Sequence, residues 1–143
     1  AVSRKPVFYK NGIHVWLKTF DELNANLMIL MSFIILGHPD WKKSNIKIHY
    51  LCREEEAESV KSWLDELIMG GRMPIYKQNI EIVVRGENKL VKDIISDYSS
   101  EAGLSIIGFI PEDVKQNGRE VFEGYDRLGN VLFVNACSAK IID

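Results

Sequence analysis

The chain has 143 residues, of which 46% are hydrophobic and 27% are charged, and its formal net charge is −2. This length predicts a single domain over residues 1–143, with a core large enough to need no disulfide or metal. Acidic and basic residues are interspersed, which argues against a surface for nucleic acid. Cys52 and Cys137 lie in apolar runs, which favours reduced, buried thiols and a cytosolic setting.

The longest apolar run, Leu27 to Leu36, has ten residues and carries no charge. Ten helical residues rise about 15 Å against the ~30 Å hydrocarbon core of a bilayer, so this run is too short to span a membrane. The segment 1–10 lacks the apolar core and cleavage site of a secretory signal. Because the chain begins at Ala1 and ends in residues that continue an apparent strand, we expect it to be a piece of a longer protein.

The first half of the chain has the pattern strand, helix, strand, helix. Residues 13–17 alternate in polarity as a strand does, and residues 46–52 form a second strand pattern. Between them, Thr19 and Glu22 have the spacing of a capping box, which predicts a helix that joins the two strands. Three glutamates stand in the first turn of the helix predicted over 53–71, where the helix dipole favours negative charge.

The second half of the chain continues the same alternation. The predicted elements are a strand over 80–86, a helix over 89–103, and strands over 104–111 and 130–137. Between the last two strands we expect a loop and then a short helix over 121–128. Five alternations of strand and helix predict an α/β fold: a doubly wound, mainly parallel five-stranded sheet with helices on both faces and the strand order 3-2-1-4-5.

Ligands of such folds bind beyond the carboxyl ends of the strands, so residues that carry chemistry are expected in the loops there. The loop after the first strand has no glycines to bring backbone amides to a phosphate, which argues against dinucleotide and flavin binding. A phosphate-accepting signalling domain would have an Asp at the end of the third strand and a Lys at the end of the fifth. Here those positions hold Arg85-Gly86 and Cys137-Ser138.

The loop after the fourth strand is where nucleotide-binding universal stress proteins place a glycine-rich phosphate loop. Gly108 and Gly118 are present, but bulky residues including Pro111 separate them. Glu112 and Asp113 would repel a phosphate, so nucleotide binding is the less favoured interpretation.

The remaining candidates for chemistry are histidines and serines. His14 and His49 would face one another if the first two strands pair, but two imidazoles without a third ligand make a poor metal site. His38 with Asp40 is more typical of a turn. Ser99, like its neighbours Tyr98 and Ser100, is interpreted as part of an accessible helix end because no base is placed to activate it. The sequence therefore predicts no enzyme, no cofactor and no metal.

The apolar helix over 22–36 has more hydrophobic positions than one sheet contact requires. The stripe predicted to face the sheet consists of Leu23, Leu27, Leu30, Met31 and Ile34. Ile29, Phe33 and Leu36 then form a second stripe on the far side, which predicts an interface with another subunit or domain. The alternative is that residues 1–9 or the loop before the last strand cover this stripe.

Several segments, spaced along nearly the whole chain, follow one another in the order found in one known protein family. They are the tryptophan-containing strand 13–17, the acidic turn Asp21-Glu22, the leucine-rich helix 27–36, the loop Trp41-Lys42-Lys43, the strand start 46–49, the helix and strand within 89–111, and the helix and strand within 125–137. Together they resemble the second half of the cytoplasmic C-terminal domain of cation-chloride cotransporters. Two features differ from that family: the long insertion before the helix at 89 is absent, as in a compact prokaryotic relative, and Asn135-Ala136-Cys137 replaces an Arg-Gly-Asn type turn.

This resemblance implies a regulatory and assembly domain, similar in shape to universal stress proteins, on the cytoplasmic face of the membrane. The expected partners are a twelve-helix transmembrane domain of the amino acid-polyamine-organocation type, the other cytosolic half of the same transporter, and a second copy in a homodimer. Such domains do not bind the transported ions. The alternative is a stand-alone universal-stress-like protein that binds a nucleotide.

Overall fold

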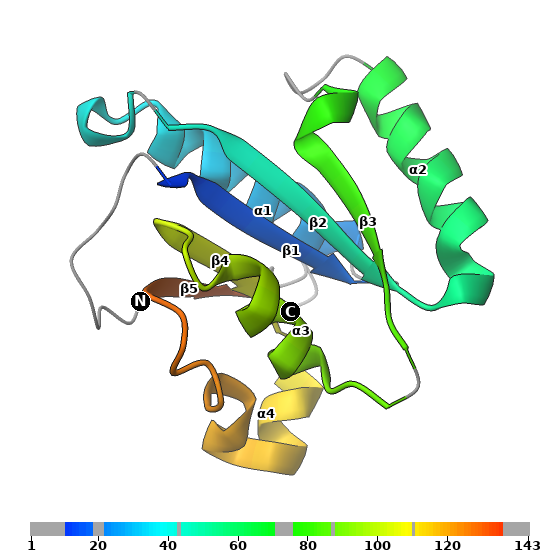
Figure 1. Ribbon diagram of the computed structural model, residues 1–143, viewed down its shortest axis with the longest axis vertical. Helices are drawn as coiled ribbons and strands as arrows, with labels where there is room; N and C mark the ends of the chain where they lie inside the picture. The colour runs from blue at the N-terminus through cyan, green and yellow to red at the C-terminus, as the bar shows by residue number, and fades with distance from the viewer. Residues whose placement is uncertain are drawn as a thin grey trace, which may run out of the picture.

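The computed structural model describes residues 11–18, 22–42, 44–70, 76–86, 88–109 and 111–135. Within them, five strands form one sheet in which every neighbouring pair is parallel (Figure 1). The order β3-β2-β1-β4-β5 confirms the predicted α/β fold and its order 3-2-1-4-5. The strands are β1 (Ile13–Lys18), β2 (Ile46–Cys52), β3 (Ile80–Val84), β4 (Leu104–Gly108) and β5 (Asn130–Val134).

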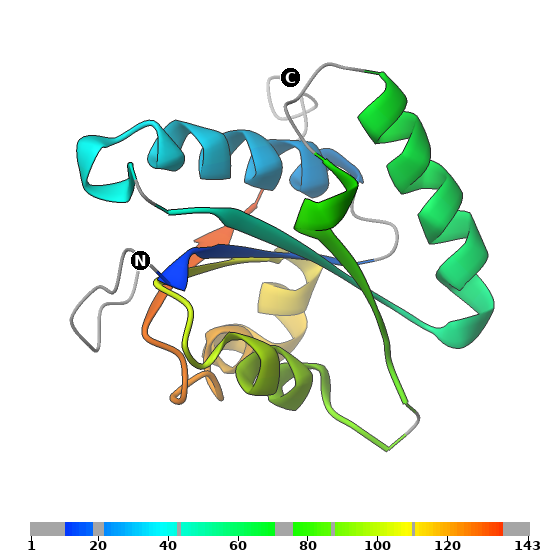
Figure 2. The ribbon, with the colours of Figure 1, turned by 45° about the horizontal axis from the view of Figure 1, so that its top comes forward.

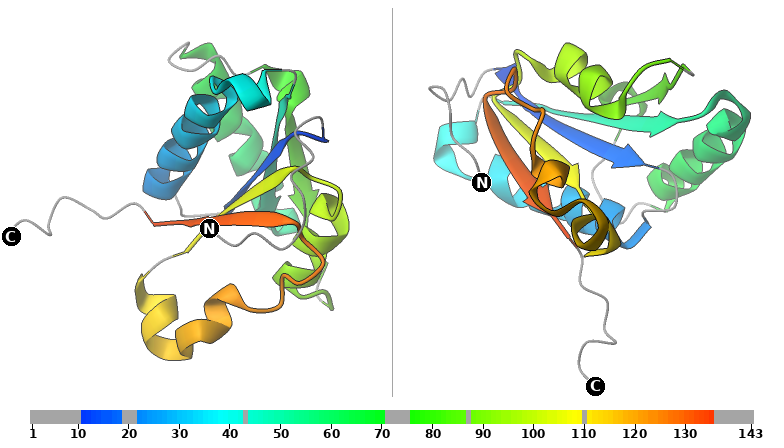
Figure 3. Two further views of the ribbon diagram at one scale, coloured as in Figure 1. Left: turned by 90° about the vertical axis from the view of Figure 1, so that its left-hand side faces the viewer. Right: turned by 90° about the horizontal axis from the view of Figure 1, so that it is seen from below.

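Helices cover both faces of this sheet, with α1 and α2 on one face and α3 and α4 on the other (Figures 2 and 3). The connections through α1 and α2 carry the chain from β1 toward β3, whereas those through α3 and α4 carry it in the opposite direction toward β5. Because crossovers between parallel strands are right-handed, connections that run in opposite directions lie on opposite faces of the sheet. The helices are α1 (Glu22–Leu36), α2 (Ala57–Met69), α3 (Val91–Ser99) and α4 (Pro111–Asn117). Short 3-10 segments are η2 (Pro39–Trp41), η3 (Glu54–Glu56), η4 (Lys77–Asn79) and η5 (Gly118–Phe122).

The central strand β1 contributes to two cores, one on each face of the sheet. Ile13, Val15 and Leu17 are fully buried in the core beneath α1 and α2. Trp16 points the other way and is fully buried in the core beneath α3. Because successive side chains of a strand alternate between faces, β1 anchors both layers of helices to the sheet.

The connection between β4 and β5 differs from its prediction. The helix α4 begins at Pro111, whereas the sequence pattern extended the fourth strand to this residue and placed the helix over 121–128. Residues 123–129 contain no helix. Proline suits the first position of a helix, since its φ is fixed near the helical value and no N–H is needed there, and acidic residues 112 and 113 favour the same end. In the part of the chain that the structure describes, no helix combines the length and the apolar character needed to cross a membrane.

Candidate functional site

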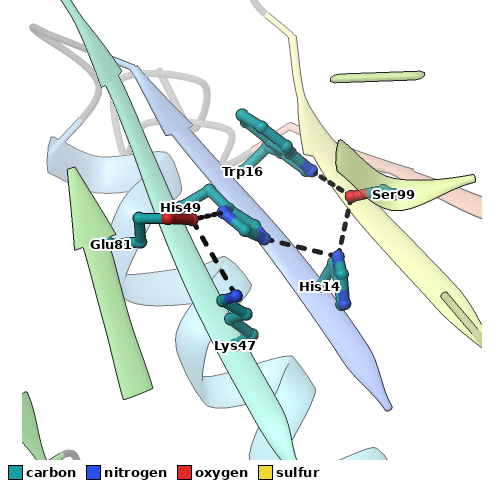
Figure 4. Close-up of polar contacts among 6 residues, drawn as sticks. All are labelled: His14, Trp16, Lys47, His49, Glu81 and Ser99. Atoms are coloured by element: carbon teal, nitrogen blue, oxygen red, sulfur yellow. Dashed lines mark hydrogen bonds and ion pairs between the residues drawn. The ribbon is translucent and has the colours of Figure 1, made fainter. Parts of the chain in front are cut away.

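A polar cluster lies on the face of the sheet that α3 covers (Figure 4). The parallel register sets His14 beside Lys47 and Trp16 beside His49, so all four side chains project from the same face. His14 Nδ1 and His49 Nε2 lie 3.3 Å apart. The prediction that the two histidines face one another is therefore confirmed.

Ser99, the last residue of α3, connects this cluster to the helix. Its Oγ lies 2.8 Å from Nδ1 of His14 and accepts a hydrogen bond of 2.8 Å from Nε1 of Trp16. The Ser99 side chain is 0% exposed, so its interpretation as an accessible serine was wrong. Two residues of β1, more than eighty positions away in the chain, enclose it. The hydroxyl thus attaches the end of α3 to the central strand.

On the other side of the cluster, a carboxylate approaches the second imidazole. Glu81 of β3 is paired with His49 in the sheet register, and its Oε2 lies 3.3 Å from Nδ1 of His49. The same carboxylate lies 3.9 Å from the ammonium of Lys47. Glu81, His49, His14 and Ser99 therefore form a continuous row from the half-exposed third strand to the buried end of α3.

Two of the contacts in this row differ in kind. An indole N–H can only donate, so Ser99 Oγ is an acceptor toward Trp16. At the other end, Glu81 Oε2 faces His49 Nδ1 at 3.3 Å without forming a hydrogen bond. Between the two ends, Nδ1 of His14 lies within reach of both Nε2 of His49 and Oγ of Ser99.

Both imidazoles are neutral at neutral pH. Burial lowers the pKa of His14 from 6.5 to about 4, and the charge of Lys47 contributes to the same shift. Burial lowers the pKa of His49 to about 3, with His14 and Lys47 lowering it further. Because Ser99 is enclosed, the row is not placed to deliver its hydroxyl to a substrate. Among the described residues, no group of three or more His, Cys, Asp or Glu side chains is placed to hold a metal ion.

The two other predicted polar positions have simple structural roles. His38 caps the short η2 segment, with Nδ1 accepting from the backbone N–H of Asp40 at 3.1 Å, which fits the predicted turn. Cys52 is a buried free thiol, as expected, and burial followed by the charge of Glu56 raises its pKa. Cys137 and the capping residue Thr19 lie outside the described residues.

The predicted interface on α1 needs a correction. Ile29 is 0% exposed and belongs to the core over the sheet, so it cannot meet a partner. Leu30 and Ile34, which were predicted to face the sheet, are 50% and 66% exposed. The helix is apolar on all sides, so helical periodicity alone did not indicate which side is buried. Two polar residues mark the buried side: Asn24 donates to the Phe109 carbonyl at 3.0 Å and Ser32 donates to the Ile29 carbonyl at 2.6 Å.

Phe33 and Leu36, the other two residues of the predicted interface, are half-buried. They line a groove of about 240 Å³ together with Ile46 and Ile48 of β2. The loop before β5 does not cover α1, since its Leu128 is buried in the core on the opposite face. Residues 1–9, the other suggested cover, lie outside the described part of the chain. The exposed apolar surface of α1 therefore shifts to Leu30 and Ile34, next to this groove.

Comparison with known proteins adds no family to these observations. No protein-family model matches the chain, and no curated protein matches it.

Proposed function

We propose that this chain is a cytosolic regulatory and assembly domain of a secondary active ion transporter of the cation-chloride cotransporter type. Its role is to mediate dimerisation or docking to the membrane domain. The observation that carries the proposal is the outer face of α1, defined by Leu30 and Ile34 with the half-buried Leu27 and Met31 beside them.

This face differs from the outer side of an ordinary surface helix. Leu30 and Ile34 are one helical turn apart, so their exposed side chains are adjacent rather than scattered. From Asn24 to Leu36 the helix has no charged residue that would keep the face in water. The groove lined by Phe33 and Leu36 lies at the C-terminal end of the same helix. A partner that covers this face removes a continuous apolar surface from water.

The resemblance of the spaced segments to cotransporter domains supports the choice of partner. It includes the leucine-rich helix itself, and it implies a second copy, the other cytosolic half and the membrane domain as neighbours. The competing function is a stand-alone nucleotide-binding protein similar to universal stress proteins. The composition of the first turn of α4 argues against it, because Pro111 has no N–H to donate and the acidic residues 112 and 113 would repel a phosphate.

Fractionation of cells that make the protein natively, followed by an immunoblot, tests the proposal as a whole. A band far above the 16.4 kDa of this chain, found in the membrane pellet, is the expected result. A band near 16.4 kDa in the supernatant would refute a transporter domain. The nucleotide alternative has a separate test, since a ligand at about 100 times its Kd stabilises a protein by about 2.7 kcal/mol. We expect ATP and ADP to give no larger thermal shift than inorganic pyrophosphate, which lacks the nucleoside.

The contribution of α1 is tested with the double variant Leu30→Glu/Ile34→Lys. We expect sedimentation equilibrium to show weaker self-association, or a pull-down with the other cytosolic half to show weaker docking, while circular dichroism remains unchanged. The matched control is Met69→Lys, which replaces an apolar residue that is 86% exposed at the end of α2. If both variants behave as the unmodified chain in both assays, the outer face of α1 is not an interface.

A further inference from the structure

The carboxyl ends of three adjacent strands border a second hollow, distinct from the groove beside α1. This cleft has a volume of about 290 Å³, and Leu51 and Cys52 of β2 contribute to its apolar wall. It lies where β1, β2 and β3 end, next to the start of α3 at Val91. In doubly wound sheets the crevice beyond the carboxyl ends of the strands is the usual place for a ligand.

Three basic residues converge on this cleft because each stands at the end of a strand. Lys18 is the last residue of β1, Arg53 directly follows β2 and Arg85 directly follows β3. The register pairs Cys52 with Val84, and the backbone N–H of Arg85 donates to the Cys52 carbonyl at 2.7 Å, so Arg53 and Arg85 follow neighbouring strand ends at the same edge. This gathering of cations is local, since the whole chain has a formal net charge of −2.

The two guanidinium groups lack carboxylate partners within the described part of the chain. Arg85 is held by a hydrogen bond of 3.3 Å from Nε to the Lys89 carbonyl, which leaves its terminal nitrogens for another acceptor. Among the described residues of the lining, Glu56 is the one acidic side chain, and its carboxylate accepts the backbone N–H of Arg53 at 3.0 Å. The described lining therefore carries Arg53 and Arg85 without carboxylate partners, beside a Glu56 carboxylate that is already bound to the backbone.

These features define the chemistry of a ligand. Arginine presents a planar fork of N–H donors that matches phosphate oxygens, whereas lysine contributes a point charge. The volume of about 290 Å³ lies just below the roughly 300–1,000 Å³ found for small-molecule pockets, so the ligand is compact. We propose that this cleft binds a compact polyphosphate anion, held by Arg53 and Arg85 and by the charge of Lys18. The site is separate from the α1 face and does not depend on the function proposed for it.

Isothermal titration calorimetry with inorganic pyrophosphate at low salt tests the site on the whole chain. We expect saturable binding of one pyrophosphate per chain, weakened by about tenfold or more in the variant Arg53→Gln/Arg85→Gln. The matched control, Lys115→Gln/Arg119→Gln, removes the same charge near the C-terminal end of α4 and the start of η5, and should bind as the unmodified chain does. The α1 variant Leu30→Glu/Ile34→Lys should also bind normally, which separates this site from the proposed function.

Two results would overturn the proposal. One is the absence of saturable binding to the unmodified chain. The other is an equal loss of affinity in the control variant, which would mean that pyrophosphate responds only to the overall charge. Circular dichroism establishes that each variant is folded. If the double variant does not fold, Arg53→Gln is measured instead, because the exposed side chain of Arg53 contributes little to packing. Its affinity should still fall clearly below that of the control.

Discussion

Acidification should destabilise this protein well above the pH at which carboxylates titrate, because the imidazoles of His14 and His49, whose pKa values are lowered in the folded chain, must become charged. In the folded chain the pKa of His14 is about 4 and that of His49 is about 3, against 6.5 for the unperturbed side chain. Below pH 6.5 the unfolded chain therefore binds more protons than the folded chain. Stability is highest above pH 6.5 and declines as the pH falls toward the two folded values.

The magnitude follows from proton linkage. Each histidine contributes at most about 1.4 kcal/mol per pH unit between its folded and unfolded pKa, so the pair sets an upper limit of about 3.5 kcal/mol between pH 7 and pH 5. His14 is half-buried rather than enclosed, and the carboxylate of Glu81 lies 3.3 Å from His49 Nδ1 and favours its charged form. Solvent screening and this contact reduce the effect, and we expect a loss of about 2 kcal/mol.

Urea unfolding between pH 7 and pH 5 measures this loss directly. The variant His14→Gln/His49→Gln should be less stable at pH 7 but should show a much flatter dependence of unfolding free energy on pH. The control His38→Gln changes an exposed imidazole and should keep the slope of the unmodified chain. Equal slopes for the double variant and the unmodified chain would refute the reasoning. If the double variant does not fold, NMR titration of the unmodified chain decides, and imidazole pKa values near 6.5 would refute it equally.

Three further predictions concern stability and are measured by urea unfolding at pH 7. Ser99→Ala leaves a buried indole N–H without its acceptor and should cost about 1–3 kcal/mol, whereas the neighbouring Ser100→Ala should have little effect. Gly12→Ala should cost about 2–3 kcal/mol, because Gly12 has φ +89° and a Cβ there would lie 2.5 Å from a side-chain oxygen. Gly86→Ala, with no atom within 4 Å of the new Cβ, is its control and should cost less than about 1 kcal/mol. Leu128→Ala should cost about 2–5 kcal/mol because that side chain is 0% exposed, and a loss below about 1 kcal/mol would contradict its place in the core.

The sheet was accessible to sequence analysis because its determinants are local. Each strand is a short apolar run, and each intervening segment is long enough for a crossover helix. The handedness of such crossovers then restricts the order of the strands. The pairing of His14 and His49 followed from the same logic, since adjacent parallel strands in this register bring their side chains to one face. The start of α4 was also present in the sequence, as a proline followed by two acidic residues.

The buried side of α1 and the position of Ser99 could not be obtained in this way. A helix that is apolar on all sides has no polar face to indicate solvent, and the residues that mark its buried side are Asn24 and Ser32. A serine at a helix end normally indicates exposure. Here it is enclosed because Trp16 and His14 of a distant strand provide its hydrogen-bond partners.

The sequence by itself therefore determined the succession of strands and helices and the order of the parallel sheet, since both depend on short-range patterns and on chain connectivity. Only the tertiary structure decided which apolar residues of α1 remain exposed, which polar groups meet beneath α3, and that Arg53 and Arg85 become neighbours at one edge of the sheet. These features arise from contacts between segments far apart in the chain. Their energy depends on distance and burial rather than on the residues adjacent in sequence.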